Sequence, residues 1–315
     1  MVEQLTFGME SSPGKPIRNI YYGTCSWTDP TLLQSKAFYP STVTSAAARL
    51  SFYAQAFPLV EVDSTFYAPP SEENAIRWAQ RTPNGFLFNI KAYGLLTHHA
   101  VAVRSLPLEI RRMLKIDEEA KTRIYMHELP TGAQLIIWEM HVQALQPLAQ
   151  ANKLGALLLQ FPYWFFFSRR HMDYLREASD RLPWRLAIEF RGGQWMEEDN
   201  RHATLSLLEE LGLTYVIVDE PQGFKSSTPP VVAVTSELAM LRFHGRNRKT
   251  WEAPVKTTAE RFNYLYNDEE LKPWAIETTK LSKDAEMVHV LWNNNYRDYP
   301  IRNARQFAEL LKEAD

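Results

Sequence analysis

Residues 155–190 decide the fold: GALLLQF (155–161), PYWFFFSR (162–169), RHMDYLREASDR (170–181), LPWR (182–185) and LAIEF (186–190). The first and last of these segments are short apolar runs, which is the pattern of strands buried on both faces. The segment Arg170–Arg181 between them has the spacing of an amphipathic helix. A buried strand, a helix and a second buried strand form a parallel unit with a crossover helix.

The same alternation extends along the whole chain. The expected strands are Ile20–Ser26, Leu59–Asp63, Phe86–Lys91, Gly155–Phe161, Leu186–Phe190, Tyr215–Asp219, Ala239–His244 and Met287–Trp292. The expected helices between them are Thr44–Phe57, Glu72–Gln80, Leu135–Ala149, Arg170–Arg181, Asn200–Leu211, Glu269–Leu281 and Asn303–Lys312. Eight such units in about 300 residues predict an α/β fold of the TIM (β/α)8 barrel type. An open doubly wound sheet is the alternative, but no Gly-x-Gly-x-x-Gly follows the first strand, so no dinucleotide cofactor is expected.

Local signals divide the chain further. Ser71 followed by Glu72 is typical of a capped helix start, and Gly155 and Gly212 stand where a left-handed helix end favours glycine. The spacing of the units is broken between the third and fourth strands, which predicts a long insertion at about residues 95–133. In a barrel this insertion rises over the mouth, either as a lid or as a peripheral excursion. We therefore expect a flexible leader (1–19) and a single barrel domain (20–315).

Composition excludes several classes of protein. The 315 residues are 45% hydrophobic and 23% charged, which is ordinary for a globular enzyme and not for a disordered chain. The formal charge of −2 provides no general attraction to nucleic acid or anionic membrane. Cys25 is the single cysteine and cannot form an internal disulfide, which favours a reducing, cytoplasmic location. No secretion signal or membrane-spanning run is visible.

Barrel enzymes place their reacting groups where strands end, and polar residues follow every expected strand here. From the first strand to the last they are Cys25, Ser26 and Trp27; Glu61, Asp63 and Thr65; Lys91; Gln160; Glu189 and Arg191; Asp219 and Glu220; Arg242, His244 and Arg246; and Asn293, Asn294 and Asn295. We expect these side chains to surround one pocket.

Several motifs around these positions match a known family in the expected order. They are Gly23-Thr24-Cys25-Ser26-Trp27, Val62-Asp63-Ser64-Thr65-Phe66-Tyr67, Gln160-Phe161-Pro162, Glu189-Phe190-Arg191, Arg242-Phe243-His244-Gly245-Arg246-Asn247, Trp292-Asn293-Asn294 and Asn303-Ala304. The chain thus resembles the YecE-like family from about residue 20 to residue 312. The resemblance implies a TIM barrel distantly similar to sugar-isomerase and apurinic-site-endonuclease barrels, and it implies no established reaction. The family pattern leads us to expect Asn at position 63, and Asp63 departs from it.

Two pairs of residues at alternate positions are candidates for catalysis. Glu189 and Arg191 share one face of a strand, so they form either an ion pair or a catalytic unit. Arg242 and His244 should both point into the barrel, where the arginine charge would keep the imidazole neutral. We assign catalytic roles to Glu189, His244 and Asp219, with Glu189 as acid or base and His244 as its complement; a purely structural histidine is the alternative.

The cations at the mouth indicate an anionic ligand. Phosphate sites in barrels often use the loops after the last two strands, where Arg242, Arg246 and the asparagine run lie. The predicted substrate-binding residues are Lys91, Arg191, Arg242, Arg246, Asn293, Asn294 and Trp27. Glu189, Asp219 and His244 resemble a metal-ligand set, but the crowd of cations opposes a metal, so we expect none.

Other residues have simpler explanations. Cys25 on an apolar strand is expected to be a small buried hydrophobe rather than a nucleophile. The aromatic run after Phe161 either stacks sugar rings or bases, or packs beneath the insertion. We predict acid–base or hydrolytic chemistry on a small anionic molecule, phosphorylated and sugar- or nucleotide-like, without a cofactor. The alternatives are a nucleic-acid-binding or processing barrel and a non-catalytic ligand-binding barrel; the overall charge argues against the former.

Overall fold

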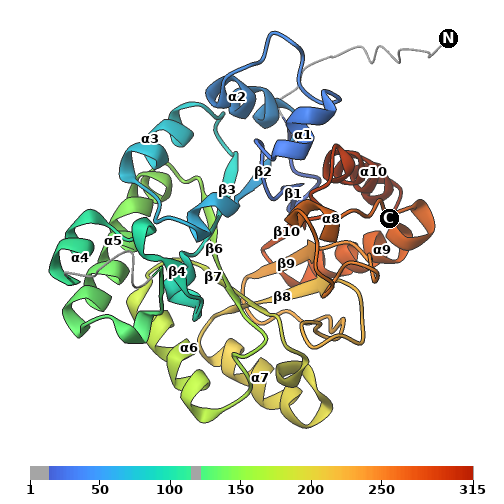
Figure 1. Cartoon of the computed structure of the whole chain (residues 1–315). Coiled ribbons are helices and arrows are strands. Elements are labelled where there is room, and N and C mark those ends of the chain that lie inside the picture. The colour runs from blue at the N-terminus through green and yellow to red at the C-terminus, as the bar shows by residue number, and fades with distance from the viewer. Residues whose placement is uncertain (1–13, 115–121, 315) are drawn as a thin grey trace.

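Eight parallel strands close into a barrel, as the sequence predicts. The computed structural model describes residues 14–114 and 122–314, and the barrel order is β1-β10-β9-β8-β7-β6-β3-β2 (Figure 1). The strands are β1 (Ile20–Thr24), β2 (Leu59–Val62), β3 (Leu87–Lys91), β6 (Leu154–Phe161), β7 (Leu186–Phe190), β8 (Thr214–Asp219), β9 (Leu238–Phe243) and β10 (Met287–Trp292). All eight predicted strands are therefore confirmed, and the fold is a TIM-like α/β barrel.

Helices surround the barrel on its outside (Figure 1). They are α1 (Pro30–Ser35), α2 (Ala46–Ala56), α3 (Glu72–Gln80), α4 (Leu108–Leu114), α5 (Thr131–Gln150), α6 (Arg169–Arg181), α7 (Glu198–Glu210), α8 (Thr258–Arg261), α9 (Asp268–Asp284) and α10 (Tyr299–Glu313). Each predicted helix is present, although α5 and α10 each begin four residues earlier than expected. Pro130 precedes α5 and Pro300 lies in the first turn of α10, where proline is compatible with a helix start. None of the described helices is long and apolar enough to cross a membrane.

Two of the three local signals act as the sequence predicts. Ser71 caps α3, because its hydroxyl accepts a hydrogen bond from the Asn74 amide. Gly212 has the positive φ of 63° expected at a helix end. The prediction for Gly155 is wrong: it lies inside β6, and its φ is not positive. A Cβ there would lie 2.6 Å from Asn89 Oδ1, so glycine is required by interior packing and not by backbone conformation.

The insertion between β3 and β6 contains ordered elements. It includes the short antiparallel pair β4 (Val101–Ala102) and β5 (Arg123–Ile124) together with α4. Leu95, Leu96 and Ile110 are fully buried, so this part of the chain packs onto the barrel. Residues 115–121 of the predicted insertion and 1–13 of the predicted leader lie outside the described residues.

Alternate residues of the strands build two separate cores. One core fills the space between barrel and helices, and the other fills the barrel interior with Cys25, Leu59, Leu87, Ala156, Leu158, Ala187, Val216, Val218, Leu238, Met240 and Leu291. Two residues further along the same faces, the side chains become polar: Glu61 follows Leu59, Glu189 follows Ala187, and Arg242 follows Met240. The barrel interior, apolar apart from buried residues such as Asn89 and His289, therefore ends in a charged layer beneath the C-terminal mouth.

Candidate functional site

A buried arginine spans the barrel beneath the mouth. Arg242 on β9 is fully buried, and its guanidinium donates to both oxygens of Glu61 on β2, with Nε 3.1 Å from Oε2. It also donates to Glu189 Oε2 on β7, and its Nη2 lies 3.6 Å from Cys25 Sγ. Every guanidinium nitrogen thus faces a buried acceptor. This geometry does not fit the predicted role of Arg242 as an anion contact; the arginine forms the floor of the mouth.

Glu189 is surrounded by hydrogen-bond donors. Its Oε1 accepts from Gln160 Nε2 at 2.6 Å, from His244 Nε2 at 3.0 Å and from Arg191 Nη1 at 3.4 Å. Burial alone would raise the pKa of Glu189, but Arg242 and His244 hold it well below its ordinary value. A carboxylate that remains ionised in this way is a poor proton carrier near neutral pH. The structure therefore does not favour the predicted acid or base role for Glu189.

The hydrogen bonds of His244 define its tautomer. Asn293 Nδ2 donates to Nδ1 at 2.8 Å, so Nε2 carries the proton that is donated to Glu189. The assignment agrees with Asn295 Nδ2, which donates to the carbonyl oxygen of the Asn293 amide at 3.3 Å. Burial lowers the pKa of His244 to about 4. The imidazole is neutral as predicted, although burial and not Arg242 is the main cause.

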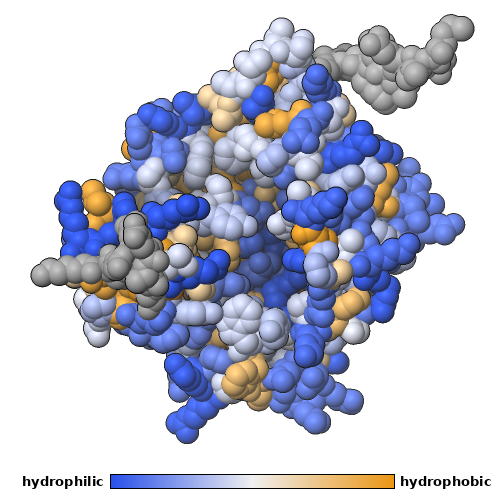
Figure 2. Space-filling view, viewed as in Figure 1, coloured by the Kyte–Doolittle hydropathy of each residue, from blue (hydrophilic) through white to orange (hydrophobic). Residues whose placement is uncertain are grey.

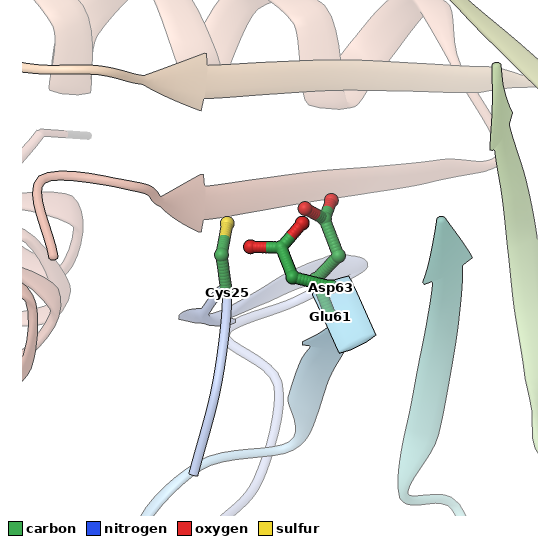
Figure 3. Close-up of side chains that lie close together, drawn as sticks. All are labelled: Cys25, Glu61 and Asp63. Atoms are coloured by element: carbon green, nitrogen blue, oxygen red, sulfur yellow. The ribbon is translucent and has the colours of Figure 1, made fainter. Parts of the chain in front are cut away.

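Two carboxyl groups and a thiol lie side by side at the ends of β1 and β2. Figure 3 shows the side chains of Cys25, Glu61 and Asp63 pointing the same way, with their ligand atoms within 4.8 Å of one another. Burial raises the pKa of Glu61 to about 7, against the opposing charge of Arg242. Glu61 is among the polar residues expected at the strand ends, but the sequence predicts no role for it. Glu61 is two residues after the interior residue Leu59, so both side chains point into the barrel. This spacing is the signal that could have identified Glu61 as part of the site.

The Cys25, Glu61 and Asp63 group has ligand types that a divalent cation accepts, and it differs from the set that the sequence suggested. Its donors are already held by cations: Arg242 binds both Glu61 oxygens, and Lys91 Nζ lies 3.4 Å from Asp63 Oδ1. Burial, assisted by the nearby Glu61 carboxylate, raises the pKa of the Cys25 thiol well above its ordinary value. A protonated thiol is a weak ligand, so the donor set does not fit a metal well.

Lys91 and Arg191 are the partly exposed cations at the mouth. Their side chains are 14% and 16% exposed, respectively. Arg191 Nη1 lies 3.0 Å from Glu220 Oε2, and the guanidinium carbon lies 4.7 Å from the Trp251 ring centroid. Burial raises the pKa of Glu220 to about 7, against the charge of Arg191. Figure 2 shows a hydrophilic hollow near the centre of this face, within the ring of strand ends in Figure 1.

Asp219 and Arg246 bind each other in a separate cluster. Arg246 Nε donates to Asp219 Oδ1 at 2.9 Å and Nη2 donates to Oδ2 at 2.5 Å, while Tyr266 and Trp274 also donate to this carboxylate. Asp219 is two residues after Ile217, whose side chain points out of the barrel. Glu220 is two residues after Val218, whose side chain points into it. Strand parity therefore favours Glu220 over Asp219 as the residue facing the mouth.

Two other predicted substrate contacts have packing partners. Asn294 is fully buried and donates to the Tyr264 carbonyl oxygen and to Asn303 Oδ1, both at 2.9 Å. Trp27 is 8% exposed, and its indole donates to the Ala46 carbonyl oxygen at 3.3 Å. Of the predicted contacts, the structure thus gathers Lys91, Arg191, Arg242 and Asn293 in one network or beside it, and it engages Arg246, Asn294 and Trp27 elsewhere.

Comparison with known proteins identifies the family. The family described as "Protein of unknown function DUF72" matches residues 21–315. The UPF0759 protein YunF of Bacillus subtilis (strain 168) is 31% identical over 299 residues, which cover 93% of this chain and 94% of YunF. The UPF0759 protein YecE of Escherichia coli (strain K12) is 23% identical over 308 residues, covering 89% of this chain and 94% of YecE.

Solved structures agree with this assignment. The crystal structure of a DUF72 family protein from Thermotoga maritima MSB8 superposes with a TM-score of 0.72 at 29% identity, covering 93% of this chain and 99% of that one. The chain belongs to the DUF72 family, and the resemblance to YecE that its motifs predict is confirmed.

Proposed function

We propose that this member of the DUF72 family is an enzyme that carries out acid–base chemistry on a small anionic molecule at the barrel mouth. The observation that carries the proposal is the pair of adjacent carboxyls, Glu61 and Asp63, beside the partly exposed Lys91. The oxygens of the two carboxyls lie within 4.8 Å of each other, and the charge of Asp63 helps to keep a proton on Glu61, a proximity that general acid–base catalysis uses. A pKa of about 7 for Glu61 gives this pair a proton to exchange near neutral pH.

Asp63 is the member of the pair that reaches the ligand. Its side chain is 26% exposed, whereas that of Glu61 is fully buried. Asp63 Oδ1 is a buried atom that accepts no hydrogen bond from the described residues, although Lys91 lies nearby. In the proposed mechanism Asp63 takes a proton from the substrate or returns it, and Glu61 adjusts the charge of the pair. Glu189 is a positioning residue that holds Arg242 and Arg191, and His244 in turn holds Glu189.

Lys91 and Arg191 are the proposed anion contacts. Both lie at the mouth with part of their side chains in water, unlike Arg242. Arg191 uses Nη1 for Glu189 and Glu220, and the described residues accept no hydrogen bond from its Nε or Nη2. A guanidinium edge of this kind can bind two oxygens of a phosphate or carboxylate.

Anion binding should be coupled to proton uptake. Below about pH 7 Glu61 and Glu220 are protonated, so Arg242, Arg191 and Lys91 outweigh the remaining carboxylates. Above that pH both carboxyls ionise and repel an anion. The affinity for an anion should therefore fall as the pH rises.

Titration calorimetry with sulfate tests the binding step, because sulfate keeps its charge between pH 6 and pH 8. We expect sulfate to bind roughly tenfold more tightly at pH 6 than at pH 8, and Arg191→Gln to weaken binding at pH 6 by at least as much. Arg246→Gln is the matched control, since this arginine is already held by Asp219. Absence of sulfate binding, or equal losses in the two variants, would contradict the proposed anion site.

Proton exchange tests the chemical step. Fructose 6-phosphate and ribose 5-phosphate are incubated with the protein in deuterium oxide, and NMR follows the hydrogens on carbons next to the carbonyl group. We expect exchange that Asp63→Asn abolishes and Glu61→Gln reduces, because each change removes a proton-accepting oxygen. Sulfate binding without exchange in either sugar phosphate would favour the non-catalytic ligand-binding barrel.

A further inference from the structure

A row of aromatic side chains extends from the proposed site across one side of the mouth. We call it the aromatic arc and define it as Tyr67, Phe66, His99, Trp164 and Tyr163. Successive ring centroids are 5.2 Å apart for Tyr67 and Phe66, 4.9 Å for Phe66 and His99, 5.8 Å for His99 and Trp164, and 5.1 Å for Trp164 and Tyr163. Each distance lies in the range of direct aromatic contact, so the arc is continuous.

Three neighbouring strands supply the arc. Phe66 and Tyr67 follow β2, His99 follows β3, and the remaining two residues follow β6, which are adjacent strands in the barrel. The arc begins at the proposed anion site, because Lys91 Nζ lies 5.1 Å from the Phe66 ring centroid and 3.4 Å from Asp63 Oδ1. A ligand whose charged group contacts Lys91 would therefore reach the arc with its next few atoms.

Three of the five arc side chains are exposed, and Phe66 and His99 between them are half-buried. Tyr67 is 68% exposed, Tyr163 52% and Trp164 44%. By contrast, Phe161 and Phe165 stack on each other at 4.0 Å and are buried, which agrees with the packing alternative for these two members of the aromatic run. Trp164 is fixed in its exposed position because its indole donates to the His98 carbonyl oxygen at 3.3 Å. Exposed aromatic surface in a continuous row is typical of a binding site.

Two buried acceptors at the strand ends lack hydrogen bonds from the described residues, and one of them, on Asp63, lies beside Lys91 at the start of the arc. Asp63 Oδ1 and Asn295 Oδ1 are buried atoms that accept no hydrogen bond within the described part of the chain. Such acceptors are matched by hydroxyl donors on a ligand. A molecule with an apolar ring face, several hydroxyl groups and an anionic group fits all three features together.

We propose that the aromatic arc stacks the sugar ring of a phosphorylated or carboxylated carbohydrate. The inference rests on the proposed function, since Lys91 and Arg191 hold the anionic group of the same ligand. The ring lies with its C–H face on the arc, and a hydroxyl group donates to Asp63 beside Lys91. The arc thus sets specificity for the sugar, while the cations provide the affinity for the charge.

Titration calorimetry on the full chain at one pH tests the arc with four probes: inorganic phosphate, glucose 6-phosphate, glucose and adenosine monophosphate. Glucose 6-phosphate should bind about tenfold more tightly than inorganic phosphate. Trp164→Ala and Tyr67→Ala together should remove most of this gain and leave the phosphate affinity unchanged. Phe166→Ala is the matched control: Phe166 is 50% exposed in the same segment, but its ring contacts His171 and not the arc.

The outcomes separate this inference from the proposed function. If phosphate binds but glucose 6-phosphate binds no more tightly, or if the arc variants behave like Phe166→Ala, the arc proposal is overturned and the anion site stands. If adenosine monophosphate binds more tightly than inorganic phosphate and glucose 6-phosphate does not, the arc stacks a nucleobase. This result would overturn the assignment of a sugar ring. Glucose binding that depends on Trp164, without phosphate binding, would support the arc and overturn the anion site.

Discussion

The charged groups on two sides of the mouth differ in how many of their atoms are hydrogen-bonded. On the side of β7, β8 and β9, Glu189 and Asp219 each accept hydrogen bonds from several donors, so we call this the paired side. On the side of β2 and β3, Asp63 Oδ1 accepts no hydrogen bond from the residues that the structure describes, and Lys91 is partly exposed, so we call this the open side. Charged groups that stabilise the fold have their hydrogen bonds satisfied within the protein. Groups with an unused donor or acceptor can bind a ligand instead. The comparison therefore favours the open side for the proposed proton transfer, with Arg191 at the edge of the paired side as an anion contact.

Replacement of Arg242 by methionine should have the largest effect. The change leaves the carboxyls of Glu61 and Glu189 buried without their common partner. We expect a loss of about 3–5 kcal/mol in the free energy of unfolding, measured by urea denaturation. A loss below about 1 kcal/mol would show that the buried network contributes little and would remove the contrast between the two sides.

Replacement by glutamine should change the free energy of unfolding differently at the two glutamates bound by Arg242. Glu189 is ionised in the folded protein, so Glu189→Gln should destabilise it by about 2–3 kcal/mol from pH 5 to pH 8. Glu61→Gln imitates the protonated carboxyl and should cost about 1 kcal/mol or less at pH 5. Chemical denaturation of both variants at several pH values provides the measurement.

The pH dependence of Glu61→Gln has a definite sign. Because the folded pKa of Glu61 is raised to about 7, the folded state binds the proton more tightly than the unfolded state does. This contribution to wild-type stability is present at acidic pH and is lost as the pH rises toward the folded pKa. Glutamine does not titrate, so the variant should gain relative to wild type between about pH 5 and pH 7. A constant difference across this range would contradict the raised pKa of Glu61.

The metal content of the purified protein tests whether the Cys25, Glu61 and Asp63 group on the open side binds a metal ion. Arg242 and Lys91 already contact Glu61 and Asp63, so purified protein should carry less than one equivalent of metal. Elemental analysis provides the measurement. A full equivalent of zinc or manganese that is lost on Cys25→Ala would establish a metal centre in place of the proposed carboxyl pair.

Arg246→Lys should produce the smallest effect. The arginine is 37% exposed and pairs with Asp219 away from the open side. Partly exposed ion pairs contribute about 1 kcal/mol or less, so the melting temperature should change little and sulfate affinity should not change. Thermal denaturation with and without sulfate measures both quantities, and a reduced sulfate-induced shift would return Arg246 to the anion site.

The sequence predicted the barrel well because the periodicity of buried strands is local. Runs such as Leu186–Phe190 carry their own signal, and all eight strands lie where that signal occurs. Parity within a strand is also local, and it would have favoured Glu220 over Asp219 and Asn293 over Asn294. Cross-barrel geometry is not local: whether Arg242 faces solvent or holds Glu61 depends on how β9 and β2 meet. The charge state of each glutamate follows from those contacts.

The position of Arg242 also has a consequence for the order of folding. Its carboxylate partners lie 181 residues away on β2 and 53 residues away on β7. An incomplete barrel that lacks β9 would keep both carboxylates hydrated, because no cation is yet present to replace the water. Closure of the ring and expulsion of that water must then occur together, at the cost of closing a long loop. We therefore expect the arginine to join the network late in folding, and chains that stop before β9, which contain six of the eight barrel strands, to remain open and hydrated.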